Sequence, residues 1–133
     1  MNKLENLVPP LELCQQMPEG SFDDSALVWQ ASTTAIELEW IVVPRGQSEP
    51  IMWRLPAPTL AEILEALPTC IPGAKKHHFY LRLFDLRLNK AGMGVGYAHS
   101  ASRGFVLAKE MYKCDANPAT AALRLWLDIN KEN

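Results

Sequence analysis

The stretch from Asn117 to Ile129 puts more apolar surface on one helix than a single neighbouring element covers. Asn117 suits the N-cap and Pro118 the first helical position, where no N–H is needed. Apolar side chains fill about 200° of the circumference at 100° per residue. Such a helix must lie deep against a sheet beside another helix, or be shared with a partner subunit, and in this chain we expect the internal cover. The polar residues form one narrow stripe: Thr120, Arg124, Asp128 and Lys131.

Two further helices are bounded by prolines. The Pro-Pro pair at 9–10 and Pro18 frame a short helix. Thr59 and Glu62 form a capping box, in which each side chain bonds the backbone N–H of the other residue. A second helix therefore begins after Thr59, with an apolar stripe over 60–67.

The remaining regular segments have the alternation and β-branched content of strands. They are 26–31, 35–43, 79–88, 93–99 and 104–108, whereas 44–58 and 68–73 contain proline and glycine and are expected to be connections. The apolar side switches near Leu83 and Phe84, which suggests a bulge or a strand covered on both faces. We expect one α+β domain over 1–133: an antiparallel sheet of about five strands packed with two or three helices, the C-terminal helix central.

The net charge is −2 over 133 residues. A charge this small and negative does not attract the chain to nucleic acid or anionic lipid in general. The distribution is uneven, because 75–90 holds five basic residues against one acid, a local +4, which leaves 8 basic and 14 acidic residues elsewhere. The run is typical of a solvated strand edge, and a docking face for an acidic partner is the alternative. The basic residues are Lys75, Lys76, Arg82, Arg87 and Lys90.

The cysteines and the N-terminal residues indicate in which cellular compartment the protein is expected. Cys14, Cys70 and Cys114 are odd in number and widely spaced, which predicts no disulfide framework and a reduced setting. The first residues lack the basic-then-apolar pattern of a signal peptide, and no apolar run approaches the roughly 20 residues of a membrane span. We expect a cytoplasmic protein with no membrane partner.

Several potential metal ligands occur without the spacing of a metal site. No two of them form the close pairs that a structural zinc site needs, and neighbouring histidines on a strand point to opposite faces. We expect no metal and no cofactor. A cysteine nucleophile with a histidine base is an enzyme alternative, because the two need not be close in sequence, although no catalytic motif surrounds either. The residues concerned are Cys70, His77, His78, His99 and Cys114.

Three other patterns have ordinary structural interpretations. The glycines of 92–96 lack dinucleotide-binding spacing and indicate a bulge or a close backbone approach. Arg103-Gly-Phe-Val matches only the start of the RNA-recognition signature, and its second stacking aromatic is absent. Trp53, between two prolines, is the tryptophan expected at an interface, whereas Trp29, Trp40 and Trp126 are expected in the core.

Three segments carry a resemblance: VPPLELCQQMPEG (8–20), PAPTLAEILEALP (56–68) and CDANPATAALRLWL (114–127). They resemble parts of small proteins encoded by gut bacteria and their prophages. The resemblance implies a mobile-element gene product and brings no activity, site or cofactor with it.

The leading functional hypothesis is a non-enzymatic, prophage-type accessory or interaction protein that binds another protein or its own copy. The broad apolar arc of the last helix is its positive support. One alternative is an enzyme with Cys70 or Cys114 beside His77, His78 or His99. The other, less expected, is a weak nucleic-acid-binding accessory protein that uses Lys75, Lys76, Arg82 and Arg87.

Overall fold

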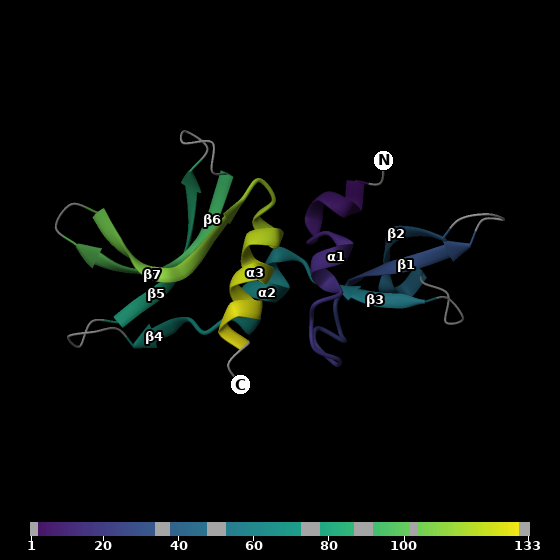
Figure 1. Cartoon of the computed structure of the whole chain (residues 1–133), viewed down its shortest axis with the longest axis horizontal. Coiled ribbons are helices and arrows are strands. Elements are labelled where there is room, and N and C mark those ends of the chain that lie inside the picture. The colour runs from purple at the N-terminus through teal and green to yellow at the C-terminus, as the bar shows by residue number, and fades with distance from the viewer. Residues whose placement is uncertain are drawn as a thin grey trace.

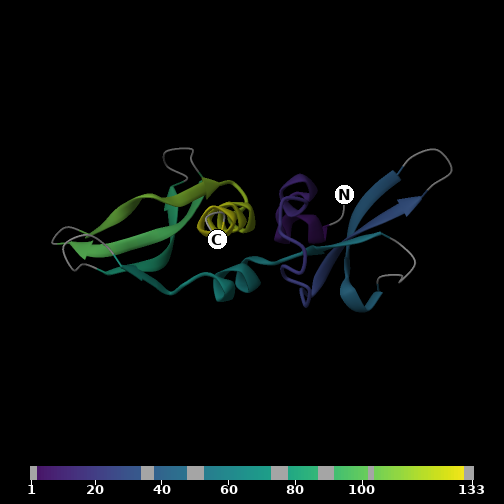
Figure 2. The same cartoon turned by 60° about the horizontal axis from the view of Figure 1, so that its bottom comes forward.

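A computed structural model describes residues 3–33, 38–47, 53–72, 78–86, 92–101 and 104–130. Two antiparallel sheets lie at opposite ends of an elongated molecule, with the longer helices between them (Figures 1 and 2). The helical elements are η1 (Lys3–Leu7), α1 (Leu11–Cys14), η2 (Arg45–Gln47), α2 (Leu60–Ala66) and α3 (Pro118–Asn130). The strands are β1 (Leu27–Thr33), β2 (Leu38–Pro44), β3 (Arg54–Ala57), β4 (Cys70–Pro72), β5 (His78–Leu86), β6 (Gly92–Ala101) and β7 (Gly104–Asp115).

The first sheet has the order β2-β1-β3. The expected hairpin of β1 and β2 is present, with Leu27 opposite Pro44 and Thr33 opposite Leu38. β3 lies in a stretch expected to be a connection, so that expectation is wrong. Its Pro56 is tolerated because β3 is an edge strand, where a missing N–H faces no neighbour.

The second sheet has the order β4-β5-β6-β7. β4 was also expected to be part of a connection, and β7 runs on to Asp115, beyond the expected end at 108. Of the two alternatives given for Leu83 and Phe84, the bulge is wrong, because β5 pairs with β6 in continuous register. The irregularity lies instead between β6 and β7, where the register shifts between Gly96 and Ala98.

α3 is covered from within the chain, as the sequence predicts. It packs against β6 and β7, against α2 and against α1. Leu123 and Leu125 are completely buried, and Ile129 is partly buried against the same hydrophobic cluster. The Trp126 ring packs on the Phe22 ring with centroids 4.9 Å apart. The apolar arc of α3 is therefore used inside the fold and gives no evidence for a subunit interface.

The predicted capping box of α2 is present and also ties α2 to the first sheet. The Thr59 hydroxyl accepts from the Glu62 N–H at 3.4 Å, and Glu62 Oε1 accepts from the Thr59 N–H at 2.8 Å. The other oxygen, Oε2, accepts from the Ala26 N–H at 2.9 Å, just before β1. The Glu62 carboxylate thus completes the N-terminal cap of α2 and links α2 to the segment that leads into β1.

Asn117 has the same double role at α3. Its Oδ1 accepts from the Ala119 N–H at 2.9 Å, which is the predicted N-cap. Its Nδ2 donates to the buried carbonyl of Val8 at 2.9 Å, across 109 residues of sequence. The start of α3 is therefore fastened to the N-terminal segment.

The α+β class is confirmed, with the C-terminal helix central and the strands divided between two antiparallel sheets. A single hydrophobic cluster joins both sheets, since it contains Trp29 and Val42 of the first sheet and Val95 and Tyr97 of the second. No helix in the described ranges is long and apolar enough to cross a bilayer.

Thr59→Ala is expected to lower the free energy of unfolding by about 1 kcal/mol, because the Glu62 N–H loses its acceptor. Thr69→Ala is the matched control, since Thr69 is exposed and lies beyond the end of α2, and its cost should stay within about 0.5 kcal/mol. Urea denaturation of both variants measures the difference. An unchanged midpoint for Thr59→Ala contradicts the cap.

Two variants of Asn117 separate its two bonds. Asn117→Ser keeps an oxygen for the cap but has no N–H for the Val8 carbonyl, and should cost about 1 kcal/mol. Asn117→Ala loses both bonds and should cost about 2 kcal/mol. Denaturation midpoints measure both costs, and wild-type stability of Asn117→Ser would contradict the long-range role.

Candidate functional site

The cysteines do not assemble a catalytic site with one another. Cys70 lies on β4 and Cys114 on β7, the two outer strands of the second sheet. Three strand spacings separate those strands, or about 14 Å. Cys14 is buried far from both in sequence, in α1, where its thiol donates to the Pro9 carbonyl at 3.7 Å.

The ionisation of Cys14 and Cys114 argues against either of them as a nucleophile. Burial raises the pKa of Cys14 to about 12; a hydrogen bond with Trp29 opposes this shift and the charge of Glu12 adds to it. Burial also raises the pKa of Cys114. A nucleophilic cysteine needs the opposite shift, toward the thiolate at neutral pH.

The histidine side chains fall outside the part of the chain that the structure describes. His77 lies outside the described residues, and the side chains of His78 and His99 are outside the described part as well. The backbone places His78 at the start of β5 and His99 near the end of β6. Among the described side chains, no three of His, Cys, Asp or Glu gather in a way that would hold a metal ion.

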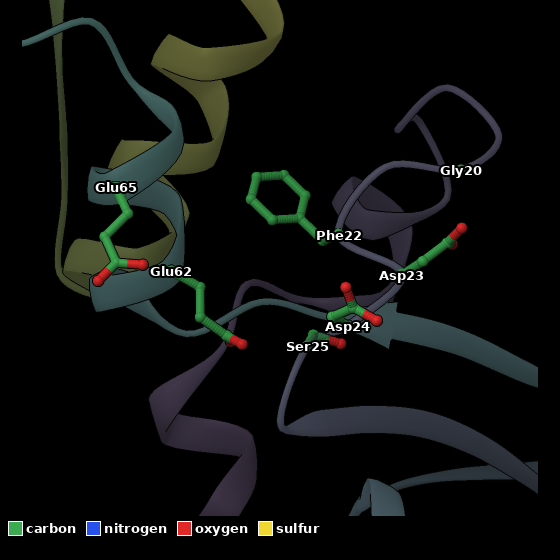
Figure 3. Close-up of a pocket in the computed structure, with 7 residues that line it drawn as sticks. All are labelled: Gly20, Phe22, Asp23, Asp24, Ser25, Glu62 and Glu65. Atoms are coloured by element: carbon green, nitrogen blue, oxygen red, sulfur yellow. The ribbon is translucent and has the colours of Figure 1, made fainter.

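A depression of about 620 Å³ opens between α2 and the segment before β1 (Figure 3). Several of the polar groups that line this depression already form hydrogen bonds within the fold. Glu62 bonds Thr59 and Ala26, and the Ser25 hydroxyl donates to the Leu27 carbonyl at 2.7 Å. Its lining residues are Gly20, Phe22, Asp23, Asp24, Ser25, Glu62 and Glu65.

The remaining carboxylates of this depression do not converge on one point. Figure 3 shows Glu65 directed away from Asp23 and Asp24, which are exposed on the opposite wall. Phe22 adopts a left-handed backbone conformation with φ of 55°, a strained choice for a bulky residue. Its ring packs on Trp126, so this conformation serves packing in the core.

The face of the second sheet opposite α3 gathers aromatic side chains and one arginine. Residues directly opposite one another in an antiparallel pair share a face. On β5 this face carries Tyr80, Arg82 and Phe84, which lie opposite Ala98, Gly96 and Gly94 of β6. On β7 it carries Tyr112 and Cys114, which lie opposite Gly96 and Gly94. We call these residues the open face.

The aromatic rings of the open face stand over a middle strand of small residues. Tyr80 is 54% exposed and Tyr112 is 40% exposed, large fractions for aromatic residues. A Cβ added at Gly94 would overlap the Phe84 ring, so that ring lies directly on the β6 backbone. Phe84 and Tyr112 meet edge to face, with centroids 6.3 Å apart. The glycine therefore serves the close approach expected from the sequence.

The opposite face of the same strands is packed. Phe79 and Leu81 of β5 and Tyr97 of β6 join the hydrophobic cluster beneath α3. Burial raises the pKa of Tyr97 to about 12, and its hydroxyl donates to the Pro68 carbonyl at 2.7 Å. The two faces of β5 thus have different roles, one in the core and one outside it.

Sequence reasoning identified only part of this surface. Arg82 was a candidate within the basic run, whereas Lys75, Lys76, Arg87 and Lys90 lie outside the described residues, as does Arg103. Tyr80, Phe84 and Tyr112 were missed. Alternation along β5 was the available signal for the first two, and Tyr112 joins them only through strand pairing.

Trp53 is 69% exposed, which agrees with its expected surface position. Its carbonyl accepts from the Ala31 N–H at 2.9 Å, so its backbone is fixed to β1. The other three tryptophans are buried or partly buried in the cluster, as predicted: Trp29, Trp40 and Trp126.

The buried thiol of Cys14 predicts a loss of stability in alkali. The unfolded thiol ionises near pH 8.5 and the folded one near pH 12, so the stabilising contribution is complete below about pH 8.5 and is lost as the pH rises toward 12. Between about pH 8 and 10.5 the wild type should lose about 2.5 kcal/mol more than Cys14→Ala. Cys70→Ala is the control and should follow the wild type in urea titrations, and parallel losses in all three proteins would contradict the assignment.

No family model, curated protein or solved structure matches this chain. Its function is therefore inferred from its own surfaces. Of these, the open face brings exposed aromatic side chains and an arginine together.

Proposed function

We propose that this chain is a non-enzymatic interaction protein of the accessory type, and that it binds on the open face of its second sheet. The observation that carries the proposal is the shared face of Tyr80, Arg82 and Tyr112, all exposed, beside the partly buried Phe84. Tyrosine and arginine are enriched among the residues that dominate binding energy.

The chemistry of the open face selects a class of partner. Aromatic rings bind planar or apolar groups, and a guanidinium binds anionic oxygens, often in a bidentate arrangement. Among its described side chains, Arg82 is the only charged one on this face. The partner is therefore expected to present flat or apolar groups to the exposed rings.

A binding role accounts for the described residues better than the enzyme alternative. Catalysis by cysteine requires a thiolate near a base, and the pKa of Cys114, one of the two candidate nucleophiles, is shifted the wrong way. Binding through aromatic stacking needs no perturbed group. It needs exposed rings on a rigid support, and β5, β6 and β7 supply that support.

The double variant Tyr80→Ser/Tyr112→Ser is expected to fold with nearly wild-type stability, within about 1 kcal/mol, because its rings lie outside the core. Leu81→Ala is the matched control on the packed face of the same strand and should cost about 2 kcal/mol or more. Urea denaturation compares the two.

A loss in the double variant as large as that of Leu81→Ala would contradict the proposal, because it would make the two rings part of the core. Near-wild-type stability would support it, since exposed aromatic residues that folding does not require are available for binding.

A further inference from the structure

We propose that residues 19–24 form a lid over Trp126 of α3, and that this lid lifts as a unit while the rest of the chain stays folded. The lid lies at the rim of the depression beside α2. The inference goes beyond the proposed function, because it concerns access to α3 and not the open face of the second sheet.

The lid has a single apolar anchor. Its sequence is Glu-Gly-Ser-Phe-Asp-Asp, and only Phe22 packs against the hydrophobic cluster. The Phe22 ring lies on the Trp126 ring with centroids 4.9 Å apart, and Figure 3 shows it projecting from the loop toward α2 and α3. The residues around it are exposed: Glu19, Gly20, Asp23 and Asp24. Loss of one ring contact therefore frees the apolar side of the segment.

Both ends of the lid are fixed, so the segment between them can lift without displacing its neighbours. Met17 packs against the hydrophobic cluster. Ser25 is buried, and its hydroxyl donates to the Leu27 carbonyl at 2.7 Å. Within the described part of the chain, no backbone hydrogen bond joins 19–24 to another helix or strand. Segments with so few contacts open before the core does.

The closed lid is held in a strained conformation. Phe22 has a φ of 55° and Gly20 a φ of 89°, both in the left-handed region. This region suits glycine but is unfavourable for a bulky residue, which adopts it only where the surroundings impose it. The contact with Trp126 is the interaction that imposes it here. Opening releases the strain, which brings the open and closed forms closer in free energy.

Opening changes what the molecule presents to its surroundings. Trp126 is half-buried beneath Phe22, and the depression of about 620 Å³ lies beside them, with Glu62 and Glu65 of α2 on its other wall. A lifted lid joins the indole of Trp126 to this depression. The lid thus controls whether part of the apolar arc of α3 is accessible, in a fold that otherwise covers that arc.

Gly20→Ala should open the lid. The nearest atom to an added Cβ is Asp23 Oδ2 at 3.9 Å, so the methyl group strains the left-handed backbone without a clash. The open form, expected at about 1% in the wild type, should become at least about fivefold more populated. Gly46→Ala is the matched control, because Gly46 is exposed, lacks a positive φ and has no atom within 4 Å of an added Cβ.

¹⁹F NMR of protein labelled with 5-fluorotryptophan measures the opening at Trp126 itself. Trp126→Phe assigns its signal, and Phe22→Gly, which removes the ring, gives the signal of an uncovered indole. In Gly20→Ala the Trp126 signal should move or split toward that position. The Trp29 signal should keep its wild-type position, because Trp29 is buried on β1. In Gly46→Ala both signals should match the wild type.

Two outcomes of this experiment would overturn the inference. One is a Trp126 signal that stays at its wild-type position in folded Gly20→Ala. The other is an equal change at Trp29 and Trp126, since the whole fold would then have loosened and the lid would not open as a unit.

Hydrogen exchange in the wild type gives a test that needs no variant. The Ser25 N–H donates to the Phe22 carbonyl at 3.0 Å, so opening of the lid breaks this bond. The Ser25 amide should exchange at least about tenfold faster than the amide of Leu125, in the middle of α3. Equal rates with the same dependence on denaturant would mean that the segment opens only when the whole chain unfolds, and the lid would be refuted.

Discussion

Two consecutive buried carbonyl groups, those of Val8 and Pro9, connect elements that lie far apart in the sequence. Neither can remain without a donor, because an unsatisfied buried carbonyl costs about 1 to 3 kcal/mol. Asn117 donates to the Val8 carbonyl at 2.9 Å, and the indole of Trp29 donates to the Pro9 carbonyl at 3.3 Å. The donors come from the start of α3 and from β1. This short segment therefore joins the C-terminal helix to the first sheet.

The other layers are joined in a similar way, by groups that complete a local structure and also bond a distant one. Glu62 closes the capping box of α2 and reaches the Ala26 N–H before β1. Tyr97 of β6 bonds the Pro68 carbonyl just beyond α2. Such bonds fix how the apolar surfaces meet, while burial of those surfaces supplies most of the stabilisation. The structure thus combines a non-directional driving force with a few directional contacts.

The helices and the longer strands could be predicted, because their signals lie within one segment of sequence. The elements that form only by pairing with a distant strand could not. The caps at Thr59 and Asn117 depend on neighbouring residues, so sequence sufficed. β3 and β4 are short, each contains a proline, and they become strands only because β1 and β5 lie beside them. Tyr112 reaches the open face through a register that shifts between Gly96 and Ala98. No periodicity within one segment contains that information.

The open face follows from how the helices cover the second sheet. α3 lies on β6 and β7 and also packs on α2, so its broad apolar arc is used between the sheet and its neighbouring helix. The opposite face of β5 and β6 has no described helix over it. The side chains on a face without a covering helix only have to be compatible with water. Polar or small residues meet that requirement with less risk of aggregation than exposed aromatic residues do. Tyr80 and Tyr112 stay largely exposed on that face, and the proposed binding role gives a reason for aromatic residues at these two positions.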